Sequence, residues 1–101
     1  MVKKVLKTLQ EIKSKRKEIY AIADKYGVSN IRVFGSVARG EDKKNSDVDF
    51  LIKTEKWVSL FEVVDFKREV EEILHKKTDI VSEGGVSKFL RERIFNEAIA
   101  I

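Results

Sequence analysis

Apolar and polar residues alternate along this chain with two periods, and these periods predict its helices and strands. An apolar residue recurs every three or four positions from Val2 to about Tyr26, after Ser59 to near His75, and from Ser87 to about Ala98, which predicts three helices. The positions expected to face the core are Val5, Leu9, Ile12, Ile19, Ile22 or Ala23, and Tyr26 in the first helix, Leu60, Val63 or Val64, Phe66 or Lys67, Val70, and Ile73 or Leu74 in the second, and Phe89, Leu90, Ile94, Ala98 and Phe95 in the third.

Residues at the helix ends support these boundaries. Ser59 and Glu62 stand three positions apart before an apolar run, which is the pattern of a capping box. Gly27 follows the first helix, where a glycine commonly ends a helix. His75 comes at the end of the second helix beside two lysines, so we expect an exposed cap rather than a metal ligand.

Three short runs rich in β-branched and aromatic residues predict strands at 30–34, 47–53 and 77–81. A short turn of helix at 37–39 and a polar loop at 41–45 join the first two strands, which we expect to be antiparallel neighbours. A helix joins the second strand to the third, so those two should be parallel. The expected fold is α/β (α+β): a small mixed β-sheet with helices packed on one face, and a flexible loop at 82–86.

Composition indicates one globular domain spanning residues 1–101, with 43% hydrophobic and 38% charged residues. Cysteine is absent, which excludes disulfides and thiolate metal sites. No apolar run approaches the roughly 20 residues that cross a bilayer, and no signal peptide is evident, so we expect a cytoplasmic protein without membrane contact. The net charge of +4 is spread among both signs. The lysines of the first helix are interrupted by acidic residues, which favours a solvated face over direct nucleic-acid binding.

One strand-loop-strand segment carries the candidate chemistry. Gly35 lacks a Cβ that would obstruct an anion, and the turn that follows offers free N–H groups and the Ser36 hydroxyl. Asp47 and Asp49 are two residues apart on a strand, so their side chains share a face with Cα atoms about 7 Å apart. Such a carboxylate pair binds hard cations, and Mg²⁺ favours carboxylates together with substrate phosphates. A phosphate cradle beside a metal site indicates a nucleotide-handling enzyme.

The spacing of this segment resembles a known family. A Gly-Ser pair, ten further residues and Asp-x-Asp form the pattern of the DNA polymerase β-like nucleotidyltransferase superfamily. The segments Phe-Gly-Ser-Val-Ala-Arg-Gly at 34–40 and Ser-Asp-Val-Asp-Phe-Leu-Ile at 46–52 are similar to those of the minimal nucleotidyltransferases, the small partners of HEPN-domain toxins. The last helix, with Leu-Arg-Glu-Arg-Ile-x-x-Glu-Ala, resembles their closing helix, so the likeness covers nearly the whole chain.

The resemblance implies a nucleotidyltransferase fold, ATP as substrate and two Mg²⁺ ions. It assigns Asp47, Asp49 and Asp79 to metal binding and catalysis, with Asp79 deprotonating the attacking hydroxyl, although an aspartate that merely opens a strand is the alternative for Asp79. Gly35 and Ser36 would bind the nucleotide. Arg39 would either stabilise phosphate charge or stand as a solvated loop residue.

The implied activity is transfer of AMP to a hydroxyl with release of pyrophosphate. The resemblance implies that the acceptor is a tyrosine of a HEPN-domain ribonuclease toxin, which would make the chain the antitoxin of a type VII toxin–antitoxin system. A chain this small is expected to use a partner as acceptor, or to complete its pocket with a second subunit as a homo-oligomer. Two alternatives stay open: an antitoxin that masks the toxin sterically, with Trp57 and the final helix as its docking surface, and an aminoglycoside-type nucleotidyltransferase.

Overall fold

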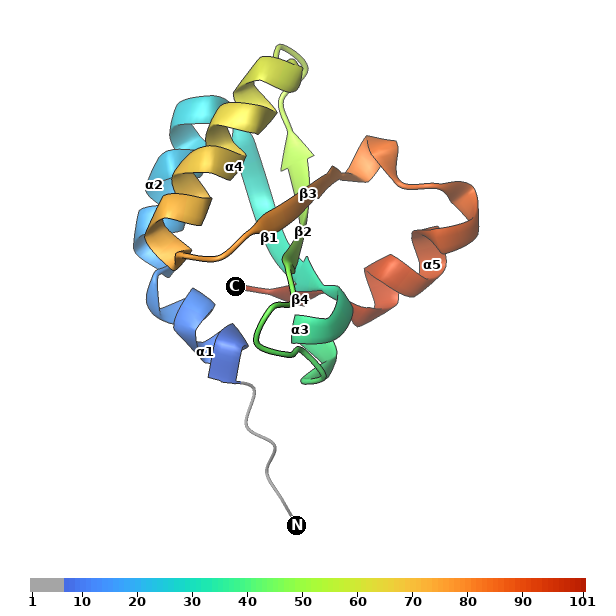
Figure 1. The fold of residues 1–101 in the computed structure, drawn as a ribbon. Helices are drawn as coiled ribbons and strands as arrows, with labels where there is room; N and C mark the ends of the chain where they lie inside the picture. The colour runs from blue at the N-terminus through green and yellow to red at the C-terminus, as the bar shows by residue number, and fades with distance from the viewer. Residues whose placement is uncertain (1–6) are drawn as a thin grey trace.

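The computed structural model of the protein describes residues 7–101, and its elements form one mixed sheet with helices beside it (Figure 1). The strands lie in the order β3-β2-β1-β4; β1 is antiparallel to both β2 and β4, and β2 is parallel to β3. This confirms the expected fold class. The elements in chain order are α1 (Lys7–Ser14), α2 (Arg16–Tyr26), β1 (Val28–Phe34), α3 (Gly35–Arg39), β2 (Val48–Thr54), α4 (Leu60–Leu74), β3 (Thr78–Ser82), the 3₁₀ turn η1 (Glu83–Gly85), α5 (Lys88–Glu97) and β4 (Ile99–Ala100).

The hydrophobic core fills the space between the sheet and the helices α2 and α4. Val48, Phe50 and Ile52 alternate along β2 and are completely buried, as the strand period predicts. From the helices, Ile19 and Phe66 complete the same cluster. Burial of each such side chain is worth about 1.5–3 kcal/mol relative to exposure. Asp49 alternates with these residues and therefore projects from the opposite face of the sheet.

The first predicted helix is in fact two helices. The chain leaves α1 at Ser14, whose hydroxyl donates to the Glu11 carbonyl oxygen at 2.6 Å, and resumes helical geometry at Arg16. Residues 13–18 contain no apolar side chain, so nothing holds this stretch against the core. The break lets Leu9 pack inward independently of Ile19. The part of the prediction from residue 2 to residue 6, including Val5, lies outside the described residues.

Helix α4 begins and ends where its sequence predicts. The Glu62 carboxylate accepts the Ser59 N–H at 2.6 Å, and the Ser59 hydroxyl oxygen accepts the Phe61 N–H at 3.2 Å, so the capping box is present. A cap of this kind contributes about 1 kcal/mol. His75 ends the helix in the left-handed conformation and is exposed, as predicted.

Helix α5 corrects two expectations. It stands on the side of the sheet away from α2 and α4, so the helices do not all pack on one face (Figure 1). Phe89 and Leu90 were expected to point inward but are 94% and 46% exposed, because the helix contacts the rest of the protein mainly through Ile94. The short strand β4 that follows was not predicted. It is two residues long and is defined only by its pairing with β1 at Arg32 and Val33.

Two local predictions also differ in detail. Residues 83–85 form a 3₁₀ turn inside the expected loop at 82–86. Of the two places expected for Trp57, the core and a partner contact, its 62% exposure excludes the core, and the partner contact stays a prediction. None of the helices among residues 7–101 has the length and apolar character needed to cross a membrane.

Candidate active site

The sheet pairings bring the predicted acidic residues and the Gly-Ser turn to one end of the sheet. Phe34, the last residue of β1, pairs with Asp49 near the start of β2. Asp49 in turn pairs with Asp79 near the start of β3. Neighbouring strands lie about 4.8 Å apart, so Gly35, Asp49 and Asp79 follow one another across adjacent strands. Asp47 directly precedes β2, and its negative charge acts on the Asp49 carboxyl.

The Asp49 carboxyl has an unusual proton affinity. Its pKa is raised to about 6, first by burial, then by the negative charges of Asp79 and Asp47, a hydrogen bond with Asp79 and, last, the charge of Glu97. Asp49 is half-buried, whereas Asp47 and Asp79 are exposed. Negative charges crowded at a half-buried position favour a bound cation, which would relieve their repulsion.

Backbone and side-chain hydrogen bonds hold the start of β3 in place. The Glu71 carboxylate, from α4, accepts the Thr78 N–H at 2.8 Å, and this bond is the main reason that the pKa of Glu71 lies below its ordinary value. The Val48 N–H donates to the Lys77 carbonyl oxygen at 3.0 Å. These bonds fix the relative positions of the two strands that carry Asp49 and Asp79.

The turn after β1 needs a glycine for two reasons. Gly35 has φ of +76°, a conformation that L side chains rarely adopt. A Cβ built there would lie 2.2 Å from Asp49 Oδ2. The close approach of backbone and carboxylate therefore depends on Gly35. Ser36 follows it as the second residue of α3, and Gly40, also at positive φ, ends that helix.

Sequence reasoning missed Glu97, the last residue of α5. Its Oε2 accepts the Gly35 N–H at 2.6 Å, and its Oε1 accepts from Arg39 Nη1 at 2.9 Å. Arg39 also donates through Nε to Glu41 Oε1 at 2.9 Å. Gly35 and Arg39, which were predicted to bind phosphate, are thus hydrogen-bonded to Glu97, which is 62 residues from Gly35 in the sequence. The signal that could have pointed to Glu97 is the closing-helix pattern, which includes it.

The carboxylates fit a magnesium site by the chemistry of their donors. Mg²⁺ prefers oxygen ligands and is commonly held by one or two carboxylates with substrate phosphates. Within residues 7–101, no three His, Cys, Asp or Glu side chains already stand in a metal-binding arrangement. Asp47 and Asp79 are exposed and their charges act on Asp49, so the set suits an ion that arrives with its nucleotide. The metal role of Asp47, Asp49 and Asp79 stays a prediction.

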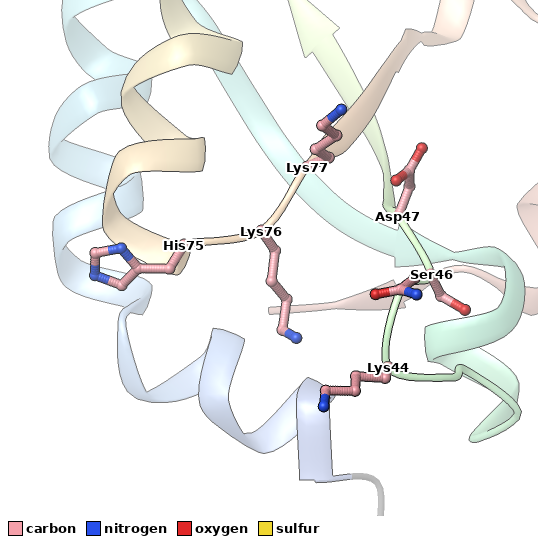
Figure 2. Close-up of a pocket in the computed structure, with 7 residues that line it drawn as sticks. Lys44, Ser46, Asp47, His75, Lys76 and Lys77 are labelled. Atoms are coloured by element: carbon pink, nitrogen blue, oxygen red, sulfur yellow. The ribbon is translucent and has the colours of Figure 1, made fainter.

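Two hollows flank the carboxylates. One, of about 340 Å³, lies between α3 and α5 and is lined by Gly35, Ser36, Arg39 and Asp49, together with residues of α5. The other, of about 510 Å³, is lined by residues 44–47 and 75–77 (Figure 2). In Figure 2 the Lys76 and Lys44 side chains point toward one another, whereas His75 points away from Asp47. Of these two hollows, only the smaller one borders the Gly-Ser turn.

Comparisons with known proteins agree with this geometry. The family model described as polymerase beta, nucleotidyltransferase matches residues 17–101. A Methanocaldococcus jannaschii protein named "putative protein adenylyltransferase" is 39% identical over 93 residues, which is 92% of this chain and 97% of the relative. The protein adenylyltransferase MntA of Thermococcus cleftensis is 32% identical over 98 residues, covering 93% of this chain and 96% of the relative.

Solved structures show the same fold. A structure described as a "putative minimal nucleotidyltransferase" superposes with a TM-score of 0.81 at 38% identity and covers 95% of both chains. A toxin–antitoxin structure with AMP-PNP gives 0.70 at 17% identity, over 83% of this chain and 69% of the other. The toxin–antitoxin MntA–HepT gives 0.64 at 14% identity, over 87% and 69%. The last two establish likeness of fold alone, and they are complexes with a toxin or with a nucleotide analogue.

Proposed function

This chain belongs to the polymerase β nucleotidyltransferase family, and on that premise we propose that it transfers AMP from ATP to a protein hydroxyl. The observation that carries the proposal is the pairing of Phe34 with Asp49 and of Asp49 with Asp79. It sets the Asp49 and Asp79 carboxylates beside a Gly-Ser turn, with Asp47 directly before β2, and the Ser36 hydroxyl of that turn suits a triphosphate.

The proposed step is an in-line displacement. The acceptor hydroxyl oxygen attacks the α-phosphorus of ATP and forms the new P–O bond. The bond from the α-phosphorus to the oxygen that bridges to the β-phosphate breaks, and its electron pair leaves with pyrophosphate. The hydroxyl proton passes to a carboxylate, for which we propose Asp79. Entering and leaving oxygens lie on opposite sides of the phosphorus in such transfers.

The sheet order suggests which side each group occupies. Gly35 and Ser36 follow β1, Asp47 and Asp49 belong to β2, and Asp79 belongs to β3, so pyrophosphate would leave over β1 and the acceptor would enter over β3. Asp47, Asp49 and Asp79 would hold Mg²⁺, which when bound neutralises triphosphate charge and stabilises both oxygens. The Ser36 hydroxyl and the N–H groups of its turn would orient the non-transferred phosphates.

We further propose a HEPN-domain toxin as the acceptor protein, because solved relatives of this fold include toxin–antitoxin complexes. Incubation of the chain with such a toxin, ATP and Mg²⁺ should add one or more AMP units to a toxin tyrosine. Intact-mass spectrometry, followed by fragment mapping, measures the addition. Inhibition of the toxin should persist after the chain is removed, because a covalent mark outlasts a complex.

The second candidate function is masking of the toxin by binding. The exposed apolar side chains favour such binding, either alone or in addition to AMP transfer. Trp57, Leu60, Phe61 and Phe89 are each more than 60% exposed, which suits docking to another protein. Masking alone predicts an unmodified toxin that is inhibited only while the chain is present. A modified toxin that also stays in a stable complex would support both activities.

The role of Asp79 can be tested by substitution. If Asp79 accepts the hydroxyl proton, Asp79→Asn should slow transfer roughly a hundredfold or more while ATP affinity falls much less. The measurements are the single-turnover rate with the acceptor and ATP affinity by calorimetry. Comparable losses in both would reduce Asp79 to a metal ligand, and unchanged rates would leave it as an ordinary residue at the start of β3.

A further inference from the structure

One face of α5 forms a wall of the hollow that borders the Gly-Ser turn. Leu90, Arg93, Ile94 and Glu97 all line this hollow. Their spacing of three, four and seven residues places them on a single side of the helix. Arg91 belongs to a different side: its Nη1 donates to the Glu83 carbonyl oxygen at 3.1 Å, and its guanidinium lies 4.5 Å from the centre of the Phe95 ring.

Arg39 has its charge neutralised within the protein. It pairs with Glu41 at 2.9 Å and with Glu97 at 2.9 Å, and these two hydrogen bonds raise the pKa of its guanidinium. A triphosphate that recruited Arg39 would have to displace two carboxylates. The same Glu97 side chain occupies the Gly35 N–H. Arg39 and Glu97 are therefore already committed to holding the turn after β1.

Arg93 is differently placed. It is exposed, it borders the same hollow as Ser36 and Asp49, and within residues 7–101 no hydrogen bond, ion pair or aromatic ring engages its guanidinium. A planar guanidinium donates two parallel hydrogen bonds to phosphate oxygens, and charge-assisted bonds of this kind are about twice as strong as neutral ones. The hollow lies on the β1 side of the carboxylates, where the non-transferred phosphates would sit.

We propose that Arg93 of α5 is the cation that binds the β- and γ-phosphates of ATP, and that Arg39 instead braces the Gly-Ser turn through Glu97. The inference rests on the proposed function, because it assigns the phosphate end of that same site. It adds α5 to the nucleotide pocket and predicts selectivity for triphosphates over monophosphates. It also replaces the notion that Arg39 meets the phosphates directly.

The test compares nucleotide affinities by calorimetry at fixed ionic strength with Mg²⁺. Arg93→Ala should weaken ATP binding roughly tenfold, the loss expected for one hydrogen-bonded charge, and should leave AMP binding unchanged. Arg93→Lys should recover part of the ATP affinity. The matched control is Lys88→Ala, which removes a positive charge from the same helix at an exposed position that does not line the hollow. Circular dichroism melting checks that each variant is folded.

The possible outcomes separate the inference from the proposed function. If the unsubstituted protein binds ATP and transfers AMP while Arg93→Ala binds ATP equally well, the inference is wrong and the function stands. Equal losses in Arg93→Ala and Lys88→Ala would also overturn it, since they would reflect overall charge. If the unsubstituted protein binds no ATP in the presence of Mg²⁺, the proposed function fails and the inference fails with it.

Discussion

Asp49→Asn is expected to abolish AMP transfer and yet to make the protein more stable near neutral pH. In the strand pairings Asp49 lies between the Gly-Ser turn and Asp79. Its carboxylate would therefore contact a metal ion bound together with the triphosphate. Loss of electrostatic stabilisation at such a centre costs on the order of a thousandfold in rate. The double variant with Asp47→Asn should be inactive as well and should keep its fold.

The stability gain follows from the raised proton affinity of this carboxyl. Its pKa is about 6 in the folded protein against 3.8 for an ordinary aspartate, so the folded state binds the proton more tightly than the unfolded state. Stability should therefore fall as the pH rises from about 4 through about 6, and the asparagine variant should lack this fall. Because the group is half-exposed, solvent screening limits the effect to about 1 kcal/mol. A domain of this size then melts about 4–8 °C higher.

Thermal melts of the unsubstituted protein and of Asp49→Asn, without metal and at several pH values between 4 and 8, measure this effect. Asp24→Asn is the matched control, because Asp24 is exposed on α2 and distant from the sheet end. A large drop in melting temperature for Asp49→Asn would identify Asp49 as a structural residue. Retained transfer by the folded variant would exclude it from the chemistry.

Gly35→Ala should lower both the stability of the protein and its affinity for ATP. The left-handed backbone at this residue costs an L-alanine roughly 1–2 kcal/mol. The new Cβ would also meet Asp49 Oδ2 at 2.2 Å, so the carboxylate has to turn away from its place beside the turn. We expect a melting temperature lower by about 5 °C or more, and ATP binding with Mg²⁺ reduced at least tenfold.

The control for this prediction is Gly84→Ala. Gly84 lies in η1, does not have a left-handed backbone, and has open space around its would-be Cβ. It should melt within about 1–2 °C of the unsubstituted protein, as neutral surface changes do. Calorimetric titration of ATP into both variants completes the comparison. If Gly35→Ala binds ATP as well as Gly84→Ala does, the turn is not part of the nucleotide site.

Local pattern alone determined most of the elements and the candidate chemistry. The alternation of Val48, Phe50 and Ile52 predicted which face of β2 joins the main core, since strand geometry sends successive side chains to opposite faces. The capping box predicted the start of α4, because its bonds join residues three apart. The Gly-Ser turn and the two aspartates were likewise recognisable, because they lie close together in sequence and their spacing is that of a known family.

Only the tertiary structure decided the features that depend on distant contacts. The period of α5 did not reveal that Phe89 faces solvent, because a helix can cover a sheet with a narrow stripe and leave the rest bare. The strand β4 exists only through its partner β1. Glu97 meets Gly35 and Arg39 across 62 and 58 residues, a distance over which sequence periodicity carries no information. The carboxylates and the Gly-Ser turn were therefore recognisable in the sequence. Arg39, Arg93 and Glu97 come together beside them only because α5 packs near the end of β1.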